Sequence, residues 1–460
     1  MTDRARLLLD QFLGALGGPG PVGGVELTPG GSLPSVFAVS DLAQASVGAA
    51  GAACARLVAL GAGVGPSVTV DRDLASAWFG FSIRPEGWEL VSPWDALAGD
   101  YRAEDGWIKL HTNAPHHRAA ALAVLGVPGD RDAVAGAVAT WSADDLETAV
   151  VDAGGAAAAL RSRAAWDAHP QGIAVAGEPL VHHQVTDPVP GTAAPPMDAG
   201  RPLAGLRVLD LTRVLAGPVA TRLLAGWGAQ VLRIDPPGWD EPGVVPEVTL
   251  GKRCARLDLT MPEGRDRFLR LLASADVLVH GYRSDALEGL GLGAALRSET
   301  RPGLVDVSLD AYGWTGPWVT RRGFDSLVQM SSGIAEAGRA ATGADRPVPL
   351  PVQALDHAAG YLLAACALTG LAQRQVDGTG SRWRTSLARV ARLLVDTGTD
   401  GDLDGPGIEP APPRSDEPVE RTPWGDARRL PPPVVVDGAP LRWSLPAGPL
   451  GVSPPDWPPG

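Results

Sequence analysis

The sequence predicts an α/β protein with a Rossmann-like large domain on a parallel sheet and a smaller α+β domain. Residues 203–238 read as strand, helix and strand, the unit of a parallel sheet. Two further apolar strands follow, ADVLVHGY at 275–282 and GLVDVSLDAYG at 303–313. Residues 98–180 form a mixed block that opens with GDYRAEDGWIKLHTN, a hairpin that turns at Glu104-Asp105-Gly106.

Other predicted segments precede and follow the large domain in the chain. Residues 1–85 hold an Ala-rich helix and then GPSVTVDRDLASAWF, a strand that enters a helix. Residues 181–202 are rich in Pro and small residues and read as a linker to the large domain at 203–400. In WRTSLARV, at 383–390, another strand enters a helix, and the Pro-rich residues 401–460 are expected to wrap as an extended tail.

Composition excludes several classes of function. A net charge of −13 without a basic block argues against non-specific binding to nucleic acid or to an anionic membrane. The chain has three distant cysteines, Cys54, Cys254 and Cys366, which match neither a disulfide framework nor zinc spacing and favour a reducing cytoplasm. The N-terminus reads as an amphipathic helix and not a signal peptide, and no stretch is expected to span a membrane.

An internal repeat is visible in two elements. LPSVFAVSDLAQASVGAAGAACARL (33–57) resembles LPVQALDHAAGYLLAACALTGLAQR (350–374), and VTVDRDLASAWF (68–79) resembles WRTSLARVARLL (383–394). The spacing between the elements agrees, because Asp41 precedes Leu74 by the same 33 residues that separate Asp356 from Arg389. We therefore expect two related strand and helix units.

Common catalytic and cofactor motifs are absent. The turn DLTRVLAGP (210–218) lacks the G-x-G-x-x-G pattern, which disfavours NAD, and Gly217-Pro218 is also explained by a simple helix start. The paired histidines have no carboxylate cluster to complete a metal site. Ser386 lacks the flanking glycines of a hydrolase elbow.

The second half resembles the class III CoA-transferase family, which includes formyl-CoA and carnitine CoA-transferases and alpha-methylacyl-CoA racemase. The resemblance rests on four motifs in order and on the helix from Asp356, over about 203–394: PLAGLRVLDLTRVLAGPVATRLLAGWGAQVLRID, GKRCARLDLTMPEGRDRFLRLLASADVLVHGYRSDALEGLGL, RPGLVDVSLDAYGWTGPW and RRGFDSLVQMSSG. Residues 103–126 resemble the small domain of the family more weakly, and PAGPLGVSPPDWP resembles its C-terminal segment.

The order of parts differs from the family, in which the nucleotide-binding half precedes the small domain. We interpret the chain as a fusion of two truncated copies, with a partial large-domain copy in residues 1–85. By the resemblance, CoA would be contacted by Val214, Leu215, Ala216, Leu257, Thr260, Gly281, Tyr282, Arg283 and Arg322. CoA or acyl-CoA would be a substrate, with no covalently bound cofactor and no metal.

The resemblance also locates a missing nucleophile. Family transferases attack the thioester with an aspartate, and an ungapped count from Asp356 puts Arg389 at that position. A guanidinium is always protonated and cannot attack a carbonyl. In the first copy the position is Leu74, and the nearby Asp71 and Asp73 are better explained as helix caps.

Three functions remain open on this basis. The first is a CoA-transferase of acyl-CoA metabolism with a divergent mechanism, in which Asp325, Asp356 and Arg389 are the catalytic candidates. The second is a non-catalytic protein that binds CoA esters, or a partner subunit of an active relative. The third is an acyl-CoA racemase or isomerase, disfavoured because Phe324 stands where a racemase has histidine. Acyl-CoA and a carboxylic acid would be the ligands, and a homodimer or a heteromer with a related subunit the assembly.

Overall fold

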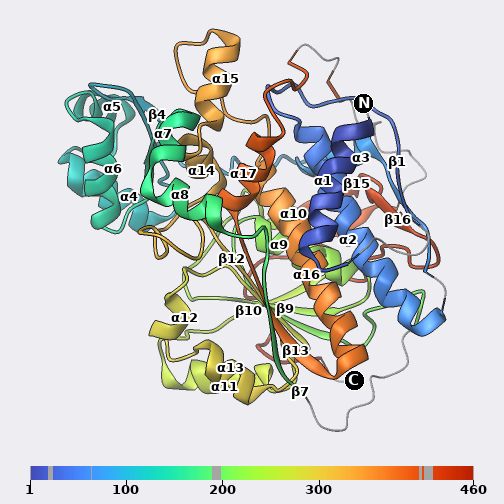
Figure 1. Cartoon of the computed structure of the whole chain (residues 1–460). Helices are drawn as coiled ribbons and strands as arrows, with labels where there is room; N and C mark the ends of the chain where they lie inside the picture. Colours follow the sequence, from blue (N-terminus) through green and yellow to red (C-terminus); the bar gives the residue numbers. More distant parts are fainter. Residues whose placement is uncertain are drawn as a thin grey trace.

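The computed structural model describes residues 2–18, 24–63, 65–188, 198–403, 407–408 and 418–458. Its centre is a seven-stranded sheet in the order β10-β9-β8-β11-β12-β13-β7, which is parallel except for β7 (Figure 1). This confirms the predicted α/β class. The strands are β7 (His182–Pro188), β8 (Arg207–Leu211), β9 (Gln230–Asp235), β10 (Lys252–Arg256), β11 (Val277–His280), β12 (Val305–Asp310) and β13 (Thr379–Ser386).

Alternation along these strands separates two cores. Valines such as Val208 and Val277 face one side, and leucines such as Leu209 and Leu278 face the other. The valine side is covered by α9 (Ala216–Gly226) and α16 (Ala354–Asp377), and the leucine side by α11 (Pro262–Leu272). The remaining helices of this half are α10 (Val245–Val248), α12 (Ala286–Gly289), α13 (Ala294–Thr300), α14 (Asp325–Ser331), α15 (Ile334–Thr342) and α17 (Leu387–Asp396).

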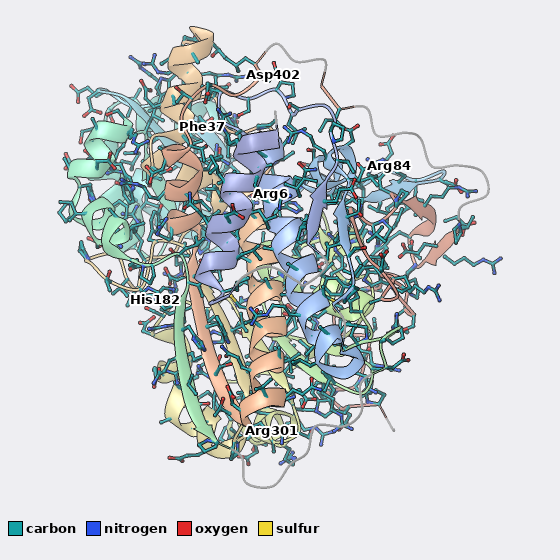
Figure 2. The ribbon with its side chains drawn as sticks, turned by 45° about the vertical axis from the view of Figure 1, so that its right-hand side comes forward. Arg6, Phe37, Arg84, His182, Arg301 and Asp402 are labelled. Carbon is teal, nitrogen blue, oxygen red and sulfur yellow. The ribbon has the colours of Figure 1, made fainter. Side chains whose placement is uncertain are left out.

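The segment expected to be a linker contributes an edge strand instead. β7 pairs antiparallel with β13, with His182 opposite Arg384 and His183 opposite Trp383, and Figure 2 shows the two strands side by side. The His183 and Trp383 rings stack with centroids 3.9 Å apart. The Pro-rich composition hid this strand because an edge strand tolerates residues that a central strand excludes. Residues 189–197 of the expected linker lie outside the described residues.

The N-terminal segment packs on the large domain and shares its core. It contains α1 (Thr2–Ala15), β1 (Val25–Leu27), α2 (Val39–Ala62), β2 (Val68–Val70), α3 (Arg72–Trp78) and β3 (Ile83–Pro85). Figures 1 and 2 both show α2 alongside α16, and the two helices are in contact. Contrary to the expectation from the sequence, Val39–Gly61 and Ala354–Asp377 are long and apolar enough to span a membrane. Both are mostly buried inside the molecule, as core helices are.

The described part of the C-terminal segment forms strands as well as extended chain. β14 (Glu420–Thr422), β15 (Gly425–Arg429) and β3 make one small sheet, and β16 (Val434–Val436) joins β1 and β2 in another. Glu247 of α10 ties these parts together. Its carboxylate accepts hydrogen bonds from Ser82 and Ile83 and pairs with Arg222 and Arg429. Although burial opposes ionisation, these two arginines lower the pKa of Glu247 to about 2.

The small domain has a core of its own. The predicted hairpin is confirmed as β4 (Gly99–Arg102) and β5 (Trp107–Leu110), extended by β6 (Ala157–Ala159). Its helices are α4 (Pro115–Leu125), α5 (Arg131–Val138), α6 (Ala143–Asp152), α7 (Arg163–Ala168) and α8 (Pro170–Gly177). The domain meets the large domain through Arg321, which donates a hydrogen bond of 2.7 Å to Glu147 of α6.

Candidate active site

The main cavity, about 360 Å³, lies at the carboxyl ends of β8, β11 and β12. This is the edge at which open parallel sheets bind ligands, because the loops that follow the strands converge there. Its wall is built by the loop from Thr212 to Gly217, the loop from Gly281 to Arg283, and the segment from Arg321 to Phe324. Asp356 at the start of α16 completes the wall.

The loop after β8 is held in a strained conformation. Val214 has φ of 63°, a left-handed value that a β-branched residue rarely adopts. Its backbone N–H donates to Glu241 at 2.9 Å, which stabilises this conformation. Gly217 packs on Thr212 so closely that an added Cβ would lie 2.2 Å from a Thr212 methyl group, so only glycine fits. The strain places Ala216, the first residue of α9, at the cavity wall.

A buried ion pair at the end of β8 holds the start of this loop in place. Lys252 Nζ lies 3.1 Å from Asp210 Oδ2, and Asp210 Oδ1 accepts the Thr212 N–H at 2.9 Å. Burial opposes ionisation of Asp210, but Lys252 and Arg233 outweigh it and lower the pKa of this carboxyl. Asp210 therefore stays ionised over the neutral range, although burial lowers the pKa of Lys252.

Three arginines give the mouth of the cavity a positive charge. The Arg213 guanidinium lies between the rings of Trp239 and Tyr282, 4.7 and 4.8 Å from their centroids. Among the described residues, no carboxylate forms an ion pair with Arg213 or Arg322, and Arg283 has only Asp285 at 3.9 Å. Unpaired guanidinium groups beside a helix N-terminus are suited to phosphate oxygens.

Burial lowers the pKa of Arg322, and the nearby charge of Arg283 adds to the effect. The two guanidinium groups are thus close enough to repel each other, and Asp285 offsets this repulsion only in part. An anionic ligand at this mouth would neutralise both.

Asp325 and Asp356 form a coupled pair at the start of α16. Asp325 is buried, and its Oδ2 accepts the N–H groups of Leu355 and Asp356 at 2.8 and 2.9 Å. Burial raises the pKa of Asp325 to about 6, against the effect of these hydrogen bonds. Burial and then the charge of Asp325 raise the pKa of Asp356 well above its usual value. Asp325 therefore positions the helix, and of the two acids Asp356 is the one that lines the main cavity.

Sequence reasoning missed a third acid, Asp310. It ends β12, lines the main cavity and accepts the N–H groups of Tyr312 and Gly313 at 2.9 and 3.3 Å. Burial raises its pKa to about 8. An aspartate at the carboxyl end of a buried strand was the available signal, since such ends face the ligand edge of a parallel sheet.

The cavity brings together most of the predicted contact residues. Its wall contains Val214, Leu215, Ala216, Gly281, Tyr282, Arg283, Arg322 and Asp356. The structure does not bring Leu257 and Thr260 to it. Leu257 packs in the core on the leucine side of the sheet, and Thr260 donates to Asp258 at 2.6 Å in the turn before α11. Both residues follow β10, the edge strand of the sheet, and β9 separates this strand from β8 at the cavity.

Arg389 lies outside the cavity wall, which its neighbour Leu387 reaches. Its backbone N–H donates to Ser386 Oγ at 3.2 Å, where Ser386 caps α17. Its Nε donates to the carbonyl oxygen of Glu178 at 2.9 Å, just after α8. Burial lowers the pKa of this guanidinium. In this geometry Arg389 joins α17 to the small domain.

A second cavity of about 320 Å³, which we call the side cavity, adjoins the main one. The two share five wall residues, Val214, Leu215, Trp239, Phe324 and Asp356. Within the described residues, no group of His, Cys, Asp and Glu is arranged to hold a metal ion. Asp356 thus faces both cavities, at the point where they meet.

Comparison with known proteins shows what the second half of the chain resembles. Residues 203–412 match the model of CoA-transferase family III. Three of the most similar curated relatives are named as CoA or acyl-CoA transferases. A probable fatty acyl-CoA transferase, Rv3272 of Mycobacterium tuberculosis, is 32% identical over 238 residues, covering 47% of this chain and 60% of the relative. Succinyl-CoA–D-citramalate CoA-transferase of Chloroflexus aurantiacus is 35% identical, covering 39% and 48%. Succinyl-CoA:glutarate CoA-transferase of Mus musculus is 34% identical, covering 40% and 44%.

The crystal structure of Rv3272 aligns at 33% identity over 43% of this chain and 57% of that one, with a TM-score of 0.39. The chain spans about half the length of the curated relatives it matches. The family model covers the wall of the main cavity except for His116 and His117 of α4. Residues 203–412 of this chain are therefore similar to CoA-transferase family III.

Proposed function

We propose that this chain binds an acyl-CoA in the main cavity and transfers CoA from the acyl thioester to a carboxylic acid. The observation that carries the proposal is a set of arginines, two of which have no ion pair among the described residues, and a helix N-terminus beside a carboxyl group of raised pKa. The arginines fit the phosphates of CoA, and the carboxyl group fits acyl transfer. The related curated proteins are named as transferases that act on CoA thioesters.

We place the parts of CoA along the wall as follows. Arg283 and Arg322 hold phosphate oxygens at the mouth, and Tyr282 offers its ring to the nucleotide. The strained loop from Val214 to Ala216 guides the pantetheine arm toward Asp356. This path ends where the two cavities meet, which puts the thioester within reach of that carboxyl group.

Asp356 is our candidate for the covalent step. Its carboxylate attacks the thioester carbonyl carbon, the C–S bond breaks, and CoA leaves as a thiolate with the bonding pair. The thiolate attacks the Asp356 carbonyl of the resulting anhydride, which releases the first acid and leaves CoA on Asp356. An incoming carboxylate attacks this thioester, and the thiolate then attacks the incoming acyl carbonyl, which restores Asp356. Because the carboxylate is the reacting form, the rate should rise with pH as Asp356 ionises.

Calorimetric titration with CoA and acetyl-CoA tests the binding step. The wild-type chain should bind both, and the double variant Arg322→Ala, Tyr282→Ala should lose binding while its circular dichroism stays unchanged. Arg270→Ala is the matched control, because Arg270 is an exposed arginine on α11. Absence of CoA binding by the wild-type chain would contradict the proposal.

A second candidate function is a CoA-ester-binding protein or partner subunit without transfer activity. Arg389 favours it, because it occupies the position at which the family resemblance expects the nucleophile, and one relative is named as an alpha subunit. Exchange of labelled CoA between an acyl-CoA and a free acid separates the two functions. Racemisation is disfavoured further, because burial lowers the pKa of His111, the imidazole stacked on Phe324, to about 3 and makes it a weak base.

A further inference from the structure

The side cavity continues from the end of the proposed CoA path. It begins at Asp356 and Phe324 and runs between the large and small domains. Its volume of about 320 Å³ lies in the range of small-molecule pockets, roughly 300–1,000 Å³. A group attached to the sulfur of CoA at Asp356 would therefore enter this space.

The wall of the side cavity is aromatic on several sides. Phe81 reaches it from the N-terminal segment and Trp94 from the loop before the small domain, opposite Trp239 and Phe324 of the large domain. The His111 ring stacks on Phe324 with centroids 3.7 Å apart and nearly parallel planes. Such rings offer apolar surface to an acyl chain.

The charged side chains described in the wall of the side cavity are acidic. Asp95, Asp240, Glu241, Asp325 and Asp356 line the cavity, and none of its described lining residues is Lys or Arg. Burial lowers the pKa of His111 to about 3, so its imidazole is neutral over the physiological range. The arginines that pair with two of these acids, Arg118 and Arg233, are themselves outside the wall.

A second carboxylate on the acyl group would lie beside these acids, and no Lys or Arg among the described residues of the wall would neutralise it. It would lie in the cavity that contains Asp325 and Asp356, whose pKa values are already raised by burial and, for Asp356, by the neighbouring charge. A further anion in a partly desolvated space of this sign is strongly disfavoured.

Two buried polar atoms in the same wall have no hydrogen-bond partner among the described residues. They are Ser326 Oγ and His111 Nδ1. Buried polar groups left unpaired are costly, so a ligand atom that satisfies them is favoured. The carbonyl oxygen of a thioester is such an atom, and every acyl-CoA supplies it, so these two atoms favour an acyl ester over free CoA.

We propose that the side cavity receives the acyl group of the substrate and selects an uncharged aliphatic or aromatic acyl chain over a dicarboxylic one. This inference rests on the proposed function of the main cavity and adds the class of substrate to it. The curated relatives do not decide this class, because their printed names include both a fatty acyl-CoA transferase and transferases for succinyl-CoA.

Calorimetry on the full chain tests it with CoA, hexanoyl-CoA, phenylacetyl-CoA, succinyl-CoA and glutaryl-CoA. Hexanoyl-CoA and phenylacetyl-CoA should bind about tenfold more tightly than CoA itself, because their chains are buried on aromatic surface. Succinyl-CoA and glutaryl-CoA should bind no more tightly than CoA. If CoA binds and the dicarboxylic esters bind as tightly as hexanoyl-CoA or more tightly, the inference alone is overturned. Failure of CoA itself to bind would overturn the proposed function.

Two variants sharpen the test. Trp94→Ala removes a partly exposed aromatic side chain from the wall. It should weaken the binding of hexanoyl-CoA until it equals that of CoA, while the affinity for CoA stays unchanged. Val91→Ala, a nearby exposed residue outside the wall, is its matched control. Ser92→Arg adds a cation at the exposed rim and should tighten succinyl-CoA about tenfold. Equal weakening of CoA and hexanoyl-CoA by Trp94→Ala would overturn the assignment of the side cavity.

Discussion

The start of α2 and the start of α16 have the same backbone but opposite electrostatics. Both helices are 24 residues long, follow an N-cap at φ −75° and ψ of 61° or 65°, and carry an aspartate at their third position. Asp41 of α2 is buried and receives two hydrogen bonds from the Arg72 guanidinium, at 3.1 and 3.2 Å. Asp356 of α16 faces another acid, Asp325, and forms no ion pair within the described part of the chain.

The difference comes from one position in the repeat. Arg72 is the first residue of α3, and its counterpart in α17 is Leu387, which lines the main cavity. The N-caps of the two helices agree. The Asp71 side chain accepts a hydrogen bond from the Leu74 N–H, and the Ser386 side chain accepts one from the Arg389 N–H. An arginine at this position neutralises the helix aspartate, whereas a leucine leaves it unpaired beside a cavity. The comparison teaches that only the second copy kept an acid available for chemistry.

The largest expected effect is on the stability of the first copy. Asp41→Asn leaves Arg72 buried without its carboxylate, which should cost about 3–5 kcal/mol of unfolding free energy. Urea denaturation followed by circular dichroism measures this. Asp356→Asn is the matched change in the second copy and should stabilise the protein at neutral pH. Equal destabilisation by both substitutions would mean that the two helix starts do not differ in the way described.

A comparable effect is expected on turnover in the second copy. Asp356→Asn should lower the rate of CoA exchange at least about 100-fold, because the amide can neither attack nor hold a proton. Labelled CoA exchange with saturating acyl-CoA measures it. Asp41→Asn, assayed at a temperature where circular dichroism shows it folded, should retain the wild-type rate. Unchanged turnover in Asp356→Asn would remove Asp356 from the mechanism.

The raised pKa values of Asp325 and Asp356 should also make the stability of the protein depend on pH. The pKa of Asp325 is about 6 in the folded chain, above about 3.9 for a free aspartate. Below the unfolded value this contribution is fully present, and it is lost as pH rises through about 6, because ionisation then favours the unfolded chain. The Tm of the wild type should therefore fall between pH 4.5 and 7.5, in a window of about three units.

The same scan on Asp356→Asn is the control for this pH dependence. Asp356→Asn removes a carboxyl group whose own pKa is raised by burial and by Asp325, so it should flatten part of the decrease in Tm. Asp41→Asn, which leaves both of these carboxyl groups in place, should not flatten it. An identical slope in all three proteins would show that the coupled pair does not carry the effect.

The smallest effect is expected at Arg389. Arg389→Ala removes the hydrogen bond to Glu178 and should cost about 1 kcal/mol of unfolding free energy. Because its side chain is outside the cavity wall, CoA exchange should change less than about threefold, or under 1 kcal/mol. The corresponding Leu74→Ala is the control in the first copy. A loss of exchange as large as that of Asp356→Asn would place Arg389 in the reaction instead.

Much of the local structure could be predicted from the sequence. The strand, helix and strand from 203 to 238, the hairpin at 104–106 and the strand-to-helix corner at Ser386 all appear where the patterns indicated. Period-two and helical spacing of apolar residues are local properties, so they are readable in one chain. The matched helices of the repeat followed from the same spacing, and their equal caps support it.

Other features depend on contacts between distant segments. Strand β7 was hidden in a Pro-rich stretch because its partner is Trp383 and the strand around it, about 200 residues away. Asp310 drew no attention because an aspartate after a strand is common, and only burial raises its pKa. Leu257 and Thr260 were expected at the cavity from resemblance alone, but sheet order puts them at the far edge.

The sequence by itself determined the elements, the matched spacing of the repeat and the arginine at position 389. Only the tertiary structure decided which acids share a cavity, which arginines lack a partner and what Arg389 contacts. The physical reason is that apolar spacing acts within one element, whereas charge depends on every group within a few ångströms. The segment around Arg72 and the segment around Leu387 are alike in pattern, and the difference in charge between them leaves Asp356 as the acid at the cavity.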